Sequence, residues 1–202
     1  MVVPVGSCEQ HGPHLPLYTD TVIAQALATA LAERIGNCVV APALSITASG
    51  EHQGFAGTLS IGNPAMAEVV VELVRSADWA AGVVLVNGHG GNAAAIEQAV
   101  ATVRAEHRRV LAWWPRIDGG DLHAGRTETS LMLAISPDDV ALDEATAGPQ
   151  PEIAELVANG VRALSPSGVL GDPAGASAGE GRQLFESLAA QLIAAVEEWS
   201  GR

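Results

Sequence analysis

Residues 6–20, GSCEQHGPHLPLYTD, concentrate carboxylates and imidazoles in a loop that proline and glycine interrupt. Residues i and i+2 of an extended segment point to the same side, so Glu9 and His11 can converge on one point. Asp20 follows a turn stiffened by prolines, where the first helix is expected to begin. Carboxylate and imidazole ligands together suit Zn²⁺, Mn²⁺ or Fe²⁺. The segment therefore predicts part of a metal site.

Three residues of this segment also have other interpretations. Asp20 could cap the N terminus of the helix that follows it. His14 is predicted to be a structural histidine or to line the rim of the site, and not to bind a metal. Cys8 is not expected to be a nucleophile, because no residue is placed to activate it.

The motif NGHGGN, residues 87–92, has a glycine on each side of His89. Glycine lets the backbone turn sharply and bring the imidazole to the end of the preceding strand. A dinucleotide-binding fingerprint is not indicated, since the motif does not match GxGxxG. His89 is therefore predicted to be a metal ligand.

The segment HAGRTETS, residues 123–130, adds His123 and Glu128. A helix that begins near residue 125 would place Glu128 in its first turns, facing the same edge as His123. The helix dipole also favours Glu at that position, which is the structural alternative. His123 could be a ligand, a general acid/base or a substrate anchor, and we prefer one of the last two roles because five ligands suffice for two metals.

These motifs together predict a dinuclear centre that activates water and polarises a carbonyl, with hydrolysis of an amide as the outcome. Asp20 could bridge two ions about 3.5–4 Å apart. The predicted catalytic residues are His123 and Glu128, and the predicted metal ligands are Glu9, His11, Asp20, His89 and Glu128.

The elements that must position these residues alternate along the chain. Strands are expected at 1–5, 38–42, 82–87 and 109–114, and helices at 21–36, 64–80, 92–108, 127–135 and 180–200, while 137–177 is expected to be mostly irregular with one helix near 151–162. Such alternation predicts an α/β fold of one domain, 1–202, with a mostly parallel sheet covered by helices on both faces. A short N-terminal element may precede it. Ligands of such sheets bind beyond the carboxyl ends of the strands, where five of the six histidines fall.

Composition excludes several classes of function. The net charge of −13 and the absence of a basic cluster exclude a nucleic-acid partner and disfavour an anionic membrane surface. All ten basic residues are Arg, so Schiff-base lysine chemistry and a Walker-A lysine are excluded. With two cysteines, no CxxC and no signal or membrane-spanning segment, the protein is expected to be cytoplasmic. A hydrophobic content of 48% favours a homo-oligomer.

Four ordered motifs, GSCEQHGPHLPLYTD, EHQGFAGTLSIG, NGHGGN and HAGRTETSLML, resemble those of the creatininase family of metal-dependent amidohydrolases. They span residues 9–135, and SPSGVLGDPAGASAGEG extends the similarity to most of the chain. The resemblance implies a creatininase-like fold, two divalent ions (Zn²⁺, Fe²⁺ or Mn²⁺) and a homo-oligomer, often a hexamer. It implies metal roles for four residues and places His123 near substrate. The four are Glu9, His11, Asp20 and His89.

The chain departs from creatininase itself at two positions. Gly91 stands where creatininase has a glutamate, and Glu128 is predicted to complete the second metal site in its place. Gly119 stands where creatininase has a tryptophan, which argues against creatinine as substrate. Trp114 matches another tryptophan of the family and could line the pocket.

The motifs are most similar to family members that cleave a peptide bond near the C terminus of a modified precursor peptide. In redox-cofactor biosynthesis these members release a Val-Tyr-derived heterocycle. A small modified peptide is thus the implied substrate. Arg126 is predicted to bind its terminal carboxylate, and Glu51 and His52 are predicted to contact it. The alternatives are hydrolysis of a small cyclic amide or formamide, and a noncatalytic metal-binding scaffold subunit.

Overall fold

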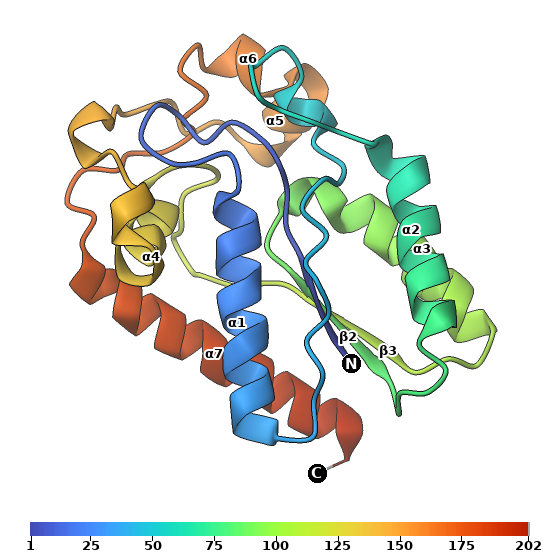
Figure 1. Cartoon of the computed structure of the whole chain (residues 1–202). Helices are drawn as coiled ribbons and strands as arrows, with labels where there is room; N and C mark the ends of the chain where they lie inside the picture. Colours follow the sequence, from blue (N-terminus) through green and yellow to red (C-terminus); the bar gives the residue numbers. More distant parts are fainter. Residues whose placement is uncertain (202) are drawn as a thin grey trace.

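A three-stranded parallel sheet forms the centre of the protein (Figure 1). The computed structural model describes residues 1–201. The strands are β1 (Val2–Val5), β2 (Val83–Asn87) and β3 (Val110–Trp113), in the order β1-β2-β3. The helices are α1 (Thr19–Ile35), α2 (Gly62–Ser76), α3 (Ala93–Ala105), α4 (Arg126–Ile135), α5 (Ile153–Asn159), α6 (Val161–Leu164) and α7 (Ala178–Ser200).

The predicted strand at 38–42 is wrong as a regular element. The segment runs extended beside β1 and makes only isolated parallel bridges, Val2 with Val40 and Val5 with Leu44. Val2 N–H donates to the Val39 carbonyl and Ala41 N–H donates to the Val2 carbonyl, both at 2.8 Å. Pro42 lacks an N–H group, so the ladder cannot continue through it. The fourth strand of the expected sheet is therefore an irregular edge.

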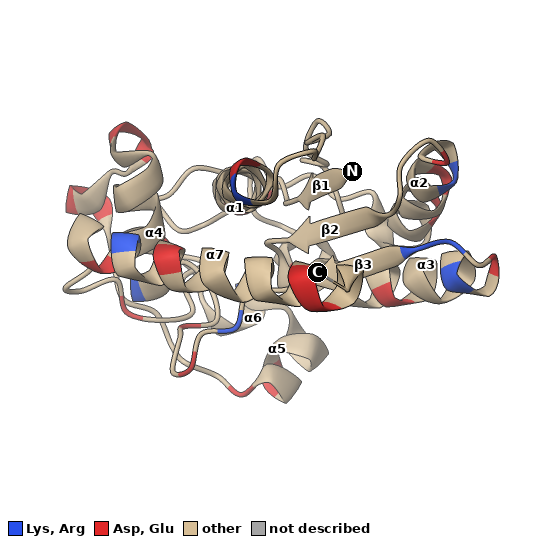
Figure 2. Ribbon diagram, turned by 90° about the horizontal axis from the view of Figure 1, so that it is seen from below, with Lys and Arg blue, Asp and Glu red and all other residues tan. Residues whose placement is uncertain are grey.

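Helices cover both faces of the sheet, as predicted. Side chains alternate between the faces of a strand, so Val84 and Val86 point to the layer of α1, α4 and α7. Val83 and Leu85 point to the layer of α2 and α3. The helices of each layer also contact one another, α4 against α7 and α2 against α3. Figure 2 shows the acidic residues spread over the outer helices and loops around this core.

The carboxyl ends of the three strands meet at one edge of the sheet, where the loops after them lie beneath α5 and α6 (Figure 1). The segment 137–177 contains these two short helices, which replace the single helix expected near 151–162. Gly160 separates them with φ 72°, a left-handed conformation that glycine adopts readily. No helix within residues 1–201 is both long enough and apolar enough to span a bilayer.

Candidate metal centre

The loop after β1 carries Glu9 and His11 into the interior, where both are completely buried. The loop is pinned by Leu59, whose N–H donates to the Cys8 carbonyl at 2.8 Å. His11 Nδ1 donates to the backbone oxygen of Glu9 at 3.0 Å, which leaves Nε2 directed toward Asp20. Both predicted ligands therefore lie in the interior, near Asp20.

Asp20 lies inside the first turn of α1, which begins at Thr19, so its interpretation as a helix cap is wrong. The N-cap position is Tyr18, and no side chain caps it. Ser7 Oγ donates to Asp20 Oδ2 at 2.7 Å and fixes the buried carboxylate. The helix thus holds Asp20 toward the loop that precedes it.

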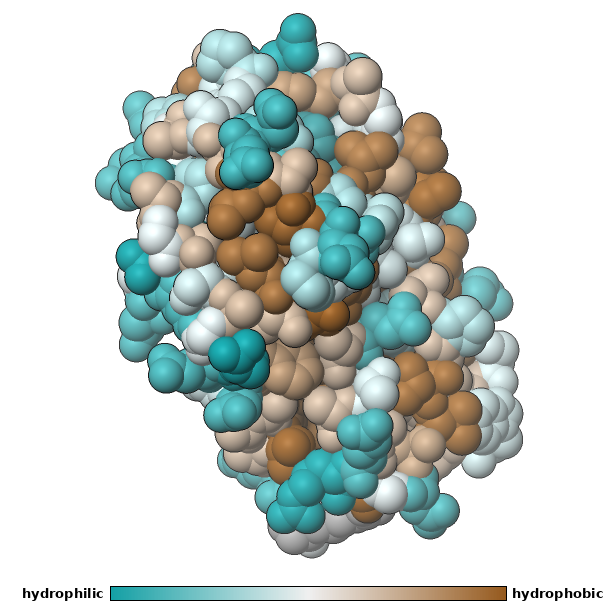
Figure 3. Space-filling model, turned by 60° about the vertical axis from the view of Figure 1, so that its left-hand side comes forward, coloured by the Kyte–Doolittle hydropathy of each residue, from teal (hydrophilic) through white to brown (hydrophobic). Residues whose placement is uncertain are grey.

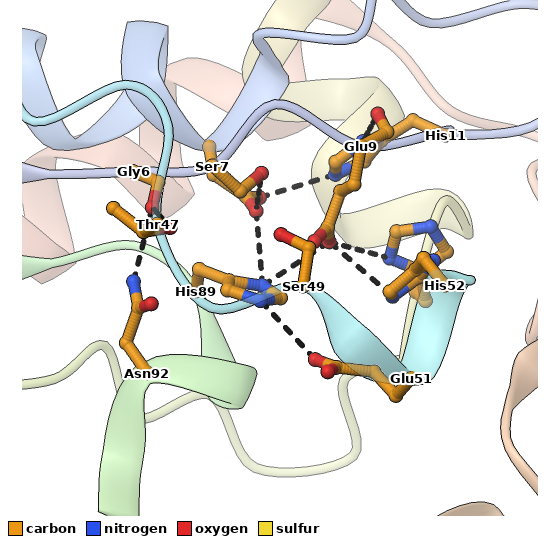
Figure 4. A network of polar contacts seen from close by, with 12 residues as sticks. Gly6, Ser7, Glu9, His11, Thr47, Ser49, Glu51, His52, His89 and Asn92 are labelled. Atoms are coloured by element: carbon orange, nitrogen blue, oxygen red, sulfur yellow. Dashed lines mark hydrogen bonds and ion pairs between the residues drawn. The ribbon is translucent and has the colours of Figure 1, made fainter. Parts of the chain in front are cut away.

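Potential ligand atoms converge in three overlapping groups. Figure 4 shows the Glu9 carboxylate directed toward His52 and His89. His89 Nδ1 lies 3.1 Å from Glu9 Oε1 and 3.2 Å from Asp20 Oδ2. His11 Nε2 lies 3.1 Å from Asp20 Oδ1. Glu9 and His11 therefore belong to different groups, and Asp20 presents one oxygen to each. The groups are Glu9, Asp20 and His89; His11, His123 and Glu128; and Glu9, His52 and His123.

The surroundings of the Glu9 carboxylate suit a bound cation, because residues 1–201 supply no hydrogen-bond donor to it. Both of its oxygens are buried without a hydrogen-bond partner among the described residues. The nitrogens of His89 and His52 approach to 3.1 and 3.3 Å without forming a hydrogen bond. Burying a neutral polar group without a hydrogen bond costs about 2–7 kcal/mol, and burying an unpaired carboxylate costs more. Metal ions bound by carboxylates and imidazoles would remove that cost.

The electrostatics of the cluster also call for added positive charge. Burial disfavours a charged His11, but the carboxylates of Asp20, Glu128 and Glu9 together outweigh burial and raise the pKa of His11 to about 10. Burial, only partly offset by His11, raises the pKa of Glu128 to about 7. Without metal, these groups thus retain protons that balance the charge of the buried carboxylates. Bound metal ions would supply that positive charge instead.

Glu128 reaches the cluster from the first turn of α4. Ala124 N–H donates to Glu128 Oε2 at 2.6 Å, and the same oxygen lies 3.9 Å from His11 Nε2. Ala124 itself has φ 52°, a left-handed conformation that is uncommon for a residue with a Cβ. This turn connects His123 to α4 and brings its imidazole and the Glu128 carboxylate to one side.

His123 is held neutral and oriented by its backbone neighbours. Its backbone pairs with Leu170, and its Nε2–H donates to the Gln10 carbonyl at 2.7 Å. Burial, together with the nearby His11 and His52, holds the pKa of His123 well below its usual range. Nδ1 therefore keeps its lone pair and can accept a proton.

Glu51 and His52 lie on a short 3₁₀ helix, Gly50–His52, against two predicted ligands. His52 Nδ1 accepts a hydrogen bond from the Gln10 side chain at 2.9 Å, while Nε2 faces Glu9. Glu51 Oε1 lies 3.1 Å from His89 Nε2 (Figure 4). Both residues also line the cavity at the cluster, and their contact with substrate stays a prediction.

A cavity of about 580 Å³ opens beside the cluster. One side of it is polar, with Glu9, His89 and His123. Another part of its lining is apolar, and most of the large apolar residues there belong to α5 and α6. Its apolar residues are Leu122, Ile153, Leu156, Val157, Val161 and Leu170. The cluster therefore faces space for a substrate with an apolar part.

Trp114 and Arg126 lie away from this cavity. Trp114 lines a second cavity of about 260 Å³, which shares His89 and Glu128 with the first. Arg126 lines neither cavity, and its Nε donates to the Glu180 carboxylate at 2.9 Å. Trp114 is thus near the site, whereas Arg126 is engaged by α7.

Polar residues that the sequence did not single out also build the site. Asn92 donates to the Gly6 carbonyl at 3.0 Å and accepts from the Ala48 N–H at 3.1 Å, so it ties three loops together. Gln10 joins His52 to the Gly168 carbonyl at 2.9 and 3.1 Å. Each of these two residues is a side-chain amide inside a predicted motif, and that position was the available signal. The groups that they bind could not be predicted, because they lie far away in the sequence.

The comparisons with known proteins agree with this geometry. A family model described as creatinine amidohydrolase matches residues 1–196. The chain belongs to the creatininase family and is a hydrolase that acts on amide bonds. The creatininase-like fold and the family resemblance predicted from the motifs are confirmed.

One relative is the mycofactocin precursor peptide peptidase of Mycolicibacterium smegmatis, 47% identical over 210 residues, 98% of this chain and 85% of the relative. Among solved structures, a glutamate-to-glutamine mutant creatininase of the Zn-Zn type has a TM-score of 0.82 at 27% identity, covering 98% of this chain and 89% of its own. A structure named creatininase Mn has a TM-score of 0.78 at 26% identity, with the same coverage of 98% and 89%. Metals are thus bound by proteins of this fold.

Proposed function

We propose that the protein hydrolyses a peptide bond near the C terminus of the modified mycofactocin precursor peptide. The product would be the Val-Tyr-derived heterocycle formed during biosynthesis of the redox cofactor. Identity of 47% across 98% of the chain supports this substrate. The observation that carries the chemistry is the position of Asp20, whose two carboxylate oxygens face His11 and His89.

Two divalent ions per subunit would be held by the predicted ligands. Zn²⁺, Fe²⁺ and Mn²⁺ all accept this set of carboxylates and imidazoles. When bound, such ions activate water as a nucleophile and polarise the carbonyl that it attacks. The ligands are Glu9, His11, Asp20, His89 and Glu128.

His123 is the proposed proton carrier. Because its Nε2–H is committed to the Gln10 carbonyl, Nδ1 is the nitrogen that can accept and return a proton. Delivery of that proton to the departing amine would complete cleavage of the C–N bond. Glu128, whose Oε2 lies 3.9 Å from His11 Nε2, would assist as a carboxylate that can change its protonation.

The apolar wall of the cavity supports a substrate with an aliphatic side chain next to the scissile bond. Ile153 and Val157 are 64% and 80% exposed, although they are large apolar residues. Substrate packed against α5 would cover them, and this burial would contribute about 25 cal/mol per Å² of apolar surface. Glu51 and His52 would line the rest of this cavity, and Trp114 would line the second cavity, which shares His89 and Glu128 with it.

The direct test is incubation of the metal-loaded protein with the modified precursor peptide and, separately, with creatinine and a formamide. Mass spectrometry should show a C-terminal fragment from the peptide and little turnover of either small amide. Preferred turnover of the cyclic amide would contradict the proposal.

Glu9→Ala separates an enzyme from a metal-binding scaffold. The variant removes a completely buried predicted ligand. Peptide cleavage should therefore fall at least about 100-fold, the scale of one strong catalytic interaction. A matched control is Glu68→Ala, which removes an exposed carboxylate of α2. Full cleavage by Glu9→Ala would contradict the catalytic role of Glu9, whereas no cleavage by the unaltered, metal-loaded chain would favour the scaffold.

We also propose that the protein is a cytoplasmic homo-oligomer, such as a hexamer. Figure 3 shows apolar side chains exposed in several patches on one face. Val39 and Trp79 are 55% and 66% exposed. Cys8 and Cys38 are free thiols, as is usual in a reducing compartment. Light scattering coupled to size-exclusion chromatography should give a mass several times 20.6 kDa.

A further inference from the structure

Gly91 and Glu51 occupy the space behind His89. A Cβ atom on Gly91 would overlap Glu51 Oε1 and His89 Nε2, and it would lie 2.6 Å from the Ala48 carbonyl oxygen. A side chain at position 91 is therefore incompatible with the position of the Glu51 carboxylate. Gly91 does not have a positive φ, so its backbone conformation does not require glycine. The close approach of Glu51 and His89 does.

The two nitrogens of His89 face different surroundings (Figure 4). Nδ1 faces the cluster, 3.1 Å from Glu9 Oε1. Nε2 faces away from it, 3.0 Å from the Ala48 carbonyl and 3.1 Å from Glu51 Oε1. Both groups beside Nε2 accept hydrogen bonds and neither donates, so Nε2 must carry the proton. Nδ1 is then the nitrogen whose lone pair is directed to the cluster when a cation is bound.

The two acceptors at Nε2 differ in strength. The Ala48 carbonyl is neutral and is fixed by its own N–H, which donates to Asn92 at 3.1 Å. The Glu51 carboxylate is charged, and a charge-assisted hydrogen bond is about twice as strong as a neutral one. A carboxylate on the distal nitrogen also raises the basicity of a ligating imidazole.

We propose that Glu51 is a positioning residue, which accepts the Nε2–H of His89 and holds Nδ1 toward the metal site. Gly91 provides the room that this carboxylate needs. The inference rests on the metal centre of the proposed function. It assigns Glu51 to the distal side of His89, in addition to its position in the cavity wall.

The proposal predicts a graded effect on metal binding. Glu51→Ala removes the charged acceptor and should weaken Zn²⁺ binding about 10–100-fold. Glu51→Gln keeps an oxygen that can accept the same hydrogen bond, so its loss should be clearly smaller, within about tenfold. Glu68→Ala removes an exposed carboxylate from α2 and should bind Zn²⁺ like the unaltered chain.

The test measures Zn²⁺ affinity of the full chain by competition with a chromophoric chelator. The unfolding midpoint of each metal-free variant is measured beside it, and should be unchanged in both Glu51 variants. Zn²⁺ affinity of Glu51→Ala equal to that of the unaltered chain would overturn the inference. An equal loss in Glu51→Gln and Glu51→Ala would also overturn it, because the negative charge and not the hydrogen bond would then be what matters. If the unaltered chain itself bound no Zn²⁺, the proposed function would fail instead.

Discussion

At the scale of single residues, the two carboxylate oxygens of Asp20 face two different imidazoles, those of His11 and His89. The spacing of Glu9 and His11 suggested a common point, whereas each faces a different group. Only Gln10 separates the two residues, yet the His11 imidazole faces Asp20 and Glu128. Local spacing predicts which side of a segment a residue occupies, but it cannot predict which distant segment arrives there.

His14 illustrates a structural histidine beside a metal cluster. It is buried, belongs to none of the three ligand groups, and its Nε2–H donates to Thr129 Oγ1 at 2.9 Å. Its Nδ1 has no partner among the described residues. The predicted structural role agrees with this position, although the residue lies in the interior and not at a rim.

His14→Ala is expected to lower the free energy of unfolding by about 1–3 kcal/mol, because it leaves the Thr129 hydroxyl without its donor. Zn²⁺ content and peptide cleavage should be retained. Denaturant unfolding and elemental analysis of the same preparation check both parts. Loss of one equivalent of metal would show that His14 is a ligand.

At the scale of elements, the long helices were predicted closely, because their apolar periodicity and end signals are local. Two features were not predicted: the irregular conformation of segment 38–42 and the division of the helix near 151–162. Pro42 interrupts the first, and Gly160 divides the second. In both cases a single residue interrupts a segment whose other residues favour a regular strand or helix.

The contact between α4 and α7 depends on Gly181. A Cβ atom there would overlap the Ser130 carbonyl oxygen. Gly181→Ala is therefore expected to destabilise the fold by about 1–3 kcal/mol through overpacking. Gly179→Ala is the matched control, because the nearest atoms to a Cβ there lie 3.9 Å away. Equal unfolding midpoints for the two variants would contradict the close approach.

Arg126 links the same two helices through Glu180, which also accepts from Ser130 Oγ at 2.8 Å. The sequence predicted that Arg126 binds substrate, whereas this position predicts a structural role. Arg126→Gln and Glu180→Gln should each lower stability slightly, and neither should raise the KM for peptide. A higher KM in Arg126→Gln alone would support the substrate role.

The same link has a defined pH dependence. The hydrogen bond from Arg126, followed by that from Ser130, lowers the pKa of Glu180 below its ordinary 4.5. The ionised Glu180 carboxylate therefore makes its full contribution to folding stability above pH 4.5. This contribution is lost as the pH falls through the lowered pKa. The stability difference between the unaltered chain and Glu180→Gln should shrink over that range, as measured by urea unfolding. A difference that stayed constant with pH would contradict the assignment.

At the scale of the whole molecule, the most successful prediction was the edge at which the loops meet. Parallel strands place their carboxyl ends together, so the position of the loops followed from the alternation of strands and helices. The apolar wall of the cavity was not predicted, because α5 lies in a segment rich in proline and glycine. Ile153 and Val157 come to line one cavity with His123 only in the folded chain.

Removal and restoration of metal tests the central claim most directly. The protein would be stripped with a chelator and assayed on the modified precursor peptide before and after stepwise addition of Zn²⁺, Fe²⁺ or Mn²⁺. Cleavage should disappear in the stripped protein and return as about two equivalents bind per chain, as expected for a two-metal site. Cleavage that persists at full rate after complete removal of metal would contradict the account.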